Sequence, residues 1–168
     1  MDETVAFGGR LYLILVLLLG FSRGMDILST WVATPGLVLE GNPIAKWLGW
    51  KWGLPLNVAL CLVFALWPLP AIIISTTSVL VAARNFQSAW LMRSLGEEYY
   101  RAWHVARIRE TQPSLYLFCL FGQTVLTGAV GVALLYFSAP DYLVPVAIGL
   151  GIISYAFTVA LSSAGPPA

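Results

Sequence analysis

Residues 54–83 read LPLNVALCLVFALWPLPAIIISTTSVLVAA, thirty consecutive positions without a charged side chain. A helix needs roughly 20 apolar residues to cross a bilayer, so an uncharged run of this length is typical of a membrane span. Thirty helical residues would measure about 45 Å, which is too long for an upright span. Pro68 and Pro70 lie in the middle and lack the N–H that a helix interior uses. The stretch therefore predicts one kinked spanning helix, with a re-entrant hairpin of two half-spans as the alternative.

Three further apolar segments, residues 11–34, 114–137 and 142–163, are each long enough to cross a bilayer. The chain of 168 residues is 59% hydrophobic and 10% charged, whereas soluble domains carry about 25% charged residues. A chain this apolar has too little polar surface for a soluble globule. The sequence predicts an all-α, polytopic membrane protein in which residues 1–168 form a single domain with four transmembrane helices.

The first apolar segment is predicted to be a retained helix. Met1-Asp2-Glu3 is acidic where a signal peptide is basic, and Ser22-Arg23-Gly24-Met25-Asp26 is not a small-residue cleavage site.

Residues 84–112 form a polar stretch between the predicted spans. Its apolar side chains recur at helical spacing: Leu91, Leu95, Tyr99, Ala102 and Ala106. Glu97 precedes Arg101 by four residues, the favourable order for an ion pair on a helix. The pattern predicts an amphipathic interfacial helix over about 90–110 that lies on the membrane surface and is broken near Gly96.

The distribution of Lys and Arg predicts the orientation. In a four-span arrangement, six basic residues fall on the side of the termini: Arg10, Arg84, Arg93, Arg101, Arg107 and Arg109. Only Lys46 and Lys51 fall on the other side. Because cytoplasmic loops are enriched in Lys and Arg, both termini and the 90–110 helix are predicted to be cytoplasmic. Asp26 and Glu40 would then lie on the opposite side from His104, the only histidine, and would not share a metal with it.

Four tryptophans are predicted to act as interfacial anchors, because an indole is apolar in its body and polar at one end. They are Trp47, Trp50, Trp52 and Trp103.

The most informative polar residues are Arg23, Asp26 and Thr30, which fall within an arc of about 60° on the first predicted helix. A charge near the bilayer centre is expensive, so an unpartnered one is not expected. One interpretation is a site for a proton, an ion or a polar substrate. The other, which the i, i+3 spacing favours, is an internal Arg23–Asp26 pair that fixes helix packing.

The connector that follows adds Glu40 and Asn42 to the candidate polar site, and Asn57 begins the next predicted span. Asn42 and Pro43 suit the cap and first position of a short interfacial helix. Glu40 is not required by that capping role.

These residues also carry a resemblance. Asp26-x3-Thr30 followed by Glu40-x-Asn42-Pro43 before an apolar span resembles a pattern in small, uncharacterised prokaryotic membrane proteins with several spans. It covers about residues 23–57. The resemblance implies a fold, and it implies that these polar residues act together, but it implies no activity. The predicted location is the prokaryotic inner membrane.

Helix-packing positions are predicted at Gly20 and Gly24, a G-x-x-x-G on the face next to the polar stripe. Gln123 and Thr127 share one face of a later span and are predicted to form hydrogen bonds between helices. Cys61 and Cys119 each lie in an apolar run and are predicted to be unpaired.

Three functions are compatible with these features. The favoured one is a non-catalytic bundle that self-associates or serves as an accessory subunit of a larger membrane complex. The second is an oligomeric transporter or channel for a small ion or solute, using Arg23, Asp26 and Glu40. The third is an intramembrane enzyme acting on lipid. No catalytic residues, metal, cofactor or nucleic acid are expected. The predicted partners are the lipid bilayer and either further copies of the chain, in a homo-oligomer, or other membrane subunits.

Overall fold

The computed structural model describes residues 4–139 and 141–164, so the acidic positions 2 and 3 lie outside the described residues. Within those ranges the chain is entirely helical, with six helices and no strand. The helices are α1 (Arg10–Ala33), α2 (Pro43–Phe64), α3 (Pro68–Leu95), α4 (Glu97–Glu110), α5 (Pro113–Phe137) and α6 (Leu143–Ala164). All except α4 are long and apolar enough to cross a membrane. This set of helices is therefore compatible with a multi-pass membrane protein.

The prediction of one kinked span over residues 54–83 was wrong, and four spans are not confirmed. α2 ends at Phe64, and α3 begins at Pro68 after a turn at Ala65–Trp67. A proline at the start of a helix is favourable, because the N–H that it lacks would have no partner there. Pro68 and Pro70 therefore begin a helix instead of bending one. Both helices of the resulting pair are candidate spans by length and composition, and α2 is kinked at Gly49, where φ is 59°.

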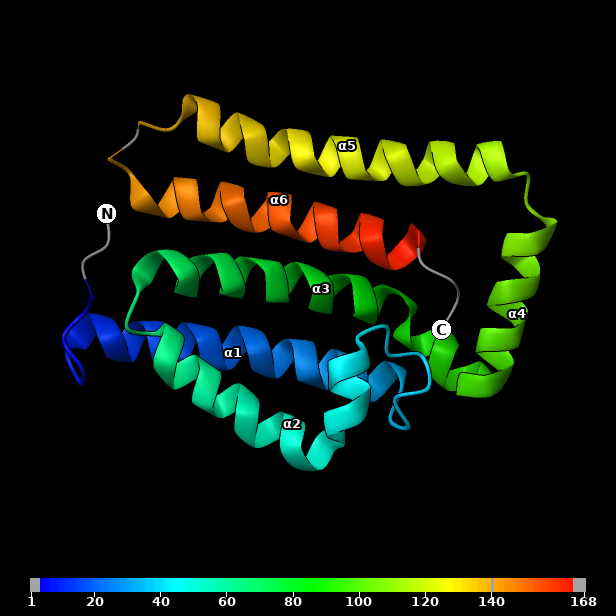
Figure 1. Ribbon diagram of the computed structural model, residues 1–168, viewed down its shortest axis with the longest axis horizontal. Helices are drawn as coiled ribbons and strands as arrows, with labels where there is room; N and C mark the ends of the chain where they lie inside the picture. Colours follow the sequence, from blue (N-terminus) through cyan, green and yellow to red (C-terminus); the bar gives the residue numbers. More distant parts are fainter. Residues whose placement is uncertain (1–3, 140, 165–168) are drawn as a thin grey trace.

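The five long helices lie in a row in the order α5, α6, α3, α1 and α2 (Figure 1). α3 packs on α1 along one side and on α6 along the other, and α5 packs mainly on α6. α2 makes fewer contacts, with α1 and α3. This open row differs from the closed four-helix bundle that four spans would form.

The contact between α1 and α3 is built on matching stripes of buried residues. On α1 these are Tyr12, Leu15, Leu19, Ser22, Ser29 and Ala33; on α3 they are Ala71, Ser75, Ser78, Ala82 and Ala89. Both sets recur at spacings of three, four or seven, the period that keeps one helix face against its neighbour. The small residues of α3 allow the two backbones to approach closely, as is common between helices in membranes. Asp26 occupies the position between Ser22 and Ser29 in the α1 stripe.

Glycines allow the closest backbone contacts of α6. A Cβ atom on Gly131 of α5 would lie 2.7 Å from the Gly149 carbonyl oxygen, so these two backbones touch. A Cβ atom on Gly151 would lie 2.7 Å from Cβ of Thr76 on α3. Because Gly149 and Gly151 point to opposite sides of α6, this helix packs closely on both neighbours.

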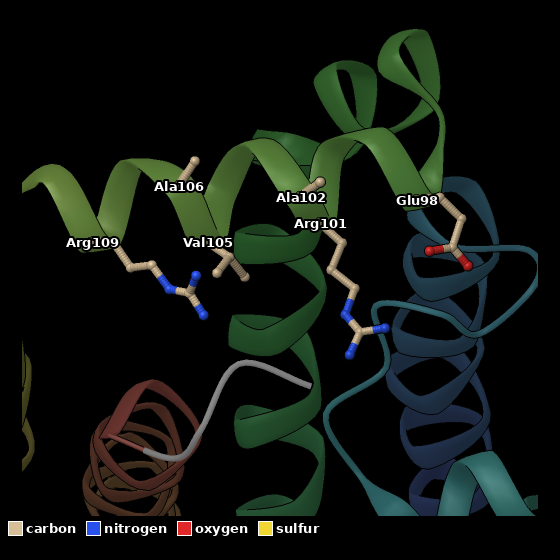
Figure 2. Close-up of a pocket in the computed structure, with 6 residues that line it drawn as sticks. All are labelled: Glu98, Arg101, Ala102, Val105, Ala106 and Arg109. Atoms are coloured by element: carbon tan, nitrogen blue, oxygen red, sulfur yellow. The ribbon is translucent and has the colours of Figure 1, made fainter.

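α4 lies across one end of the row and connects α3 to α5 (Figure 1). Gly96, with φ of 81°, separates it from α3, as the sequence predicted. Residues 90–95 belong to α3, so the separate helix is shorter than the predicted 90–110 segment. Figure 2 shows Arg101 and Arg109 extending from α4 towards the bundle.

The connector after α1 and the helix α4 lie at the same end of the row, contrary to the sequence prediction. The carboxylate of Glu97 at the start of α4 accepts hydrogen bonds from the backbone N–H of Gly36, at 2.7 Å, and of Val38, at 3.0 Å. The extra helix boundary at residues 65–67 is the reason, because one more reversal of the chain brings α4 to the end where α1 finishes. His104 and Asp26 are therefore no longer separated by the full length of the bundle.

Candidate functional site

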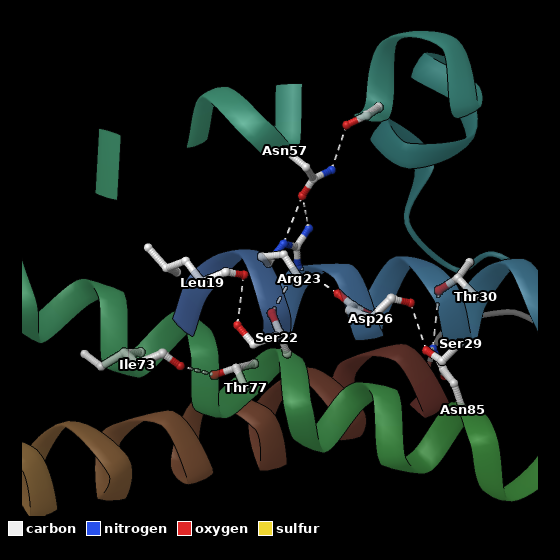
Figure 3. A network of polar contacts seen from close by, with 12 residues as sticks. Leu19, Ser22, Arg23, Asp26, Ser29, Thr30, Asn57, Ile73, Thr77 and Asn85 are labelled. Carbon is white, nitrogen blue, oxygen red and sulfur yellow. Dashed lines mark hydrogen bonds and ion pairs between the residues drawn. The ribbon is translucent and has the colours of Figure 1, made fainter. Parts of the chain in front are cut away.

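Arg23 is the centre of a polar network that joins α1, α2 and α3 (Figure 3). Its Nη1 donates to Asp26 Oδ2 at 2.7 Å and to Ser78 Oγ at 3.2 Å. Its Nε donates to Asn57 Oδ1 at 2.9 Å, and its Nη2 contacts the same oxygen. One guanidinium thus binds an acid on its own helix and neutral polar groups on two neighbouring helices.

Local structure explains how these side chains meet. Arg23 and Asp26 are three residues apart on α1, so they lie on adjacent turns of one face. Asn57 is oriented by a hydrogen bond from its Nδ2 to the Gly53 carbonyl oxygen, 2.8 Å away, one turn earlier on α2. The Arg23 and Asp26 side chains are 31% and 16% exposed, respectively. A partly buried ion pair inside apolar helices is tolerated when hydrogen bonds satisfy the remaining polar atoms, and this network provides them.

A second polar cluster continues from Asp26 along the contact between α1 and α3. Nδ2 of Asn85 on α3 lies 3.2 Å from Ser29 Oγ and 3.4 Å from Thr30 Oγ1. Ser29 Oγ in turn donates to the Asp26 carbonyl oxygen at 2.8 Å. The predicted site residue Thr30 therefore joins the network indirectly, through Asn85.

Ser75 marks the other end of the polar part of this contact. It is buried, and its Oγ has no hydrogen-bond partner among the described residues. It lies one turn before Ser78, the α3 residue that contacts Arg23. A buried hydroxyl without a partner is uncommon in proteins, so Ser75 is a polar group that this helix contact leaves unsatisfied.

Glu40 and Asn42 have local roles instead. Asn42 is the N-cap of α2, and its Oδ1 accepts from the backbone N–H of Ile44 at 2.9 Å. Glu40 Oε1 accepts from the backbone N–H of Asn42 at 2.8 Å. Neither forms a hydrogen bond with the Arg23 network within the described residues. The structure thus brings Arg23, Asp26 and Asn57 together and leaves Glu40 and Asn42 in the loop and cap.

Ser78 and Asn85 belong to the site but were not predicted from the sequence. Their signal lay in the long apolar run, where Ser75-Thr76-Thr77-Ser78 forms an unusual group of hydroxyls, and in Asn85, two residues past the end of the run. Assigning that run to one kinked span hid which of its faces was buried.

Glu97 does not form the predicted ion pair with Arg101 within the described residues; it binds the loop after α1 instead. Besides the N–H groups of Gly36 and Val38, its carboxylate accepts a hydrogen bond from the Thr34 hydroxyl. Burial acts to raise the pKa of Glu97, but these hydrogen bonds and the nearby charge of Arg93 outweigh it and lower the pKa below its usual value. The carboxylate therefore stays charged at neutral pH and holds α4 against the loop after α1.

The predicted packing positions face outward. Gly20 and Gly24 are exposed, and a Cβ atom on either would meet nothing within 4 Å. Gln123 is also exposed, while Thr127 is half-buried. Within the chain, helix contacts use Gly131, Gly149 and Gly151 instead, so a packing role for the predicted positions would require a second molecule.

The tryptophans predicted to be interfacial anchors lie towards the end of the helix row where α4 is found. Trp47 and Trp52 are 84% and 62% exposed, Trp103 is 39% exposed, and Trp50 Nε1 donates to the Pro35 carbonyl oxygen at 2.9 Å. Cys61 is buried and Cys119 is exposed, and both are free.

The chain matches no protein-family model, no curated protein and no solved structure. The described residues contain no group of three His, Cys, Asp or Glu side chains that could hold a metal ion. The resemblance to small prokaryotic membrane proteins stays a prediction. Chemically, the site offers one compensated ion pair and a line of hydroxyl and amide groups.

Proposed function

We propose that this chain is a non-catalytic integral membrane protein, a small helical bundle that self-associates or acts as an accessory subunit of a larger membrane complex. The observation that carries the proposal is the Arg23 network. Its charges are compensated within the chain, and its hydrogen bonds connect α1 to α2 and α3. Such a network fastens helices and leaves no free charge for a substrate.

Outward-facing features of α1 and α5 support association with a partner. Gly20 and Gly24 leave the α1 surface flat enough for another helix to approach. Beside Gly24, a groove of about 480 Å³ runs between α1 and α2, lined by Ile27, Leu28, Trp31, Trp50 and Leu54. Gln123 exposes an amide on the surface of α5, where a partner helix would supply hydrogen bonds that lipid tails do not.

Purification in a mild detergent, followed by native mass measurement, tests the proposal. A homo-oligomer or a stoichiometric foreign subunit is expected, and a monomer without either would contradict it. Disulfide cross-linking then identifies the contact in a background with Cys61→Ala and Cys119→Ala. Gly24→Cys should cross-link if α1 forms a self-contact, whereas Leu18→Cys, an exposed position about 120° away around α1, should not.

For the topology, we propose that all five long helices cross the membrane and that the end with α4 is cytoplasmic. Of the nine Lys and Arg residues, Arg10 is at the start of α1 and Arg23 is in mid-helix. The other seven lie towards the α4 end, a stronger asymmetry than the four-span count gave. The start of α1 would then be outside and the end of α6 inside, which replaces the expectation of two cytoplasmic termini.

Labelling with an impermeant thiol reagent tests this topology in intact cells. A cysteine at Asn42 and one at Glu98 should both be protected, while one at Asp141 should react from outside. Reaction of Asn42 but not of Glu98 would restore the four-span topology.

A second candidate is an oligomeric transporter or channel for a small ion or solute. The observation in its favour is the polar line from the unpartnered Ser75 through Ser78, Asp26 and Asn85 towards the cytoplasmic end. Flux into vesicles that contain the pure protein would support it, provided that Asp26→Asn abolishes the flux and keeps the oligomer. Absence of flux for a panel of protons, monovalent cations and small anions would dismiss it.

A further inference from the structure

α4 presents two unpaired arginines towards the bundle. Arg101 and Arg109 line a hollow of about 420 Å³ together with Glu98, Ala102, Val105 and Ala106 (Figure 2). Neither arginine forms a hydrogen bond or an ion pair within the part of the chain that the structure describes. The lining residues Ala102, Val105 and Ala106 have short side chains, which leaves the hollow beside the two guanidinium groups.

The position of this hollow indicates what it would contact. α4 lies across the row at the level where α3 ends and α5 begins, and its arginines extend from the helix towards the spans (Figures 1 and 2). In a membrane, the layer just beyond the ends of the spans contains the lipid headgroups. An arginine that points from an interfacial helix towards the bilayer meets phosphate groups, which it binds through its planar fork of N–H donors.

We propose that the Arg101–Arg109 face of α4 binds the phosphate headgroups of anionic phospholipids at this end of the bundle. The two arginines are eight residues apart, about 12 Å along the helix axis, so each has room for its own phosphate. Both side chains carry a permanent positive charge, and anionic lipids provide the complementary charge.

The hollow faces the spans because α4 is held in place. Glu97 fixes the start of α4 to the loop after α1, through Gly36 and Val38. The chain then continues directly from α4 into α5. With both ends attached, the helix cannot turn freely about its axis, so the side that faces the spans is set by the fold.

The same helix provides a matched control. Arg107 is paired with Glu110, at 2.9 Å, and both side chains are more than half exposed. Arg107→Gln changes the net charge of α4 by the same amount as Arg101→Gln or Arg109→Gln. It does so away from the hollow, so a general loss of positive charge is distinguished from loss of the site.

The test is competition between phosphatidylglycerol and phosphatidylcholine of the same chain length, read by native mass spectrometry of the full chain. Wild-type protein should retain phosphatidylglycerol preferentially. Each of Arg101→Gln and Arg109→Gln should lower the preference about fivefold, the equivalent of about 1 kcal/mol per basic residue at an anionic surface. Arg107→Gln should leave it nearly unchanged, with helical content by circular dichroism the same in all variants.

Three results would overturn the proposal. The first is a preference that survives in the Arg101→Gln/Arg109→Gln double variant. The second is an equal loss in Arg107→Gln, which would indicate non-specific attraction. The third is displacement of phosphatidylglycerol by inorganic phosphate at equal concentration, which would identify a free-anion site.

Discussion

The contact between α1 and α3 differs from the contact between α5 and α6 in the forces that hold it. α1 and α3 are joined by side-chain hydrogen bonds, with Arg23 bound to Ser78 and with Asn85 placed against Ser29 and Thr30. α5 and α6 are held mainly by close backbone packing. They meet instead where Gly131 and Gly149 allow their backbones to touch.

The difference shows two solutions to one problem. Between helices in lipid, burial of apolar side chains gives little net gain, because lipid tails are as apolar as leucine. Association must then come from hydrogen bonds or from close packing. The first half of the chain uses mainly polar groups and the second half uses glycine. Substitutions should therefore destabilise the two contacts in different ways: loss of a polar partner between α1 and α3, and steric overlap between α5 and α6.

The largest effect is expected at the polar contact. Arg23→Leu leaves the Asp26 carboxylate without its partner, a loss of about 3 kcal/mol when one member of a buried pair is removed. Arg23→Leu with Asp26→Leu removes both charges and their desolvation cost. Folded yield after solubilisation, and resistance to unfolding by sodium dodecyl sulfate, should decrease in the order wild type, double variant, Arg23→Leu. A double variant no better folded than the single one would mean that the two residues are not coupled.

A medium effect is expected at the glycine contact. In Gly131→Ala the new methyl would lie 2.7 Å from both the Gly149 carbonyl oxygen and Ile153 Cγ1. Because helix backbones cannot yield as a flexible side chain can, overpacking of this kind costs about 1–3 kcal/mol. Gly128→Ala on the same helix is the control, since its methyl would meet nothing within 4 Å. Equal stability of the two variants in the detergent titration would show that α5 and α6 separate easily.

The polar contact was partly predictable from the sequence and the glycine contact was not. A charge in an apolar segment is rare, so Arg23 and Asp26 stand out, and their spacing indicates the pair that the structure contains. Glycine is common in membrane helices, so the G-x-x-x-G at Gly20 and Gly24 could not be distinguished from Gly149 and Gly151 by pattern alone. Which glycine faces a neighbour depends on the order of the helices in the row.

That order depended on one short turn. Residues 65–67 carry no glycine and no charge, and the prolines that follow suit either a kink or a new helix. Choosing the kink gave four spans and placed α4 at the wrong end. The contact of Glu97 with Gly36 therefore could not be predicted, because the four-span arrangement placed these two residues at opposite ends of the molecule.

The smallest effect is expected where α4 meets the loop after α1, outside both helix contacts. The pKa of Glu97 is lower in the folded protein than its ordinary value, so its contribution to stability is present above the unfolded pKa. That contribution is lost as the pH falls through the folded pKa. Acidification below about pH 4.5, near the ordinary pKa of glutamate, should therefore release the Gly36 and Val38 amides while the spans stay folded. Their amide resonances, followed by NMR in detergent, report this opening.

Glu97→Gln should weaken both hydrogen bonds at neutral pH and remove most of the pH dependence, whereas Glu98→Gln, an exposed neighbour, should change neither. If the amides of Gly36 and Val38 titrate equally in Glu97→Gln and in the wild type, a different group holds α4 in place, and the side of α4 that faces the lipid would no longer be set by this contact.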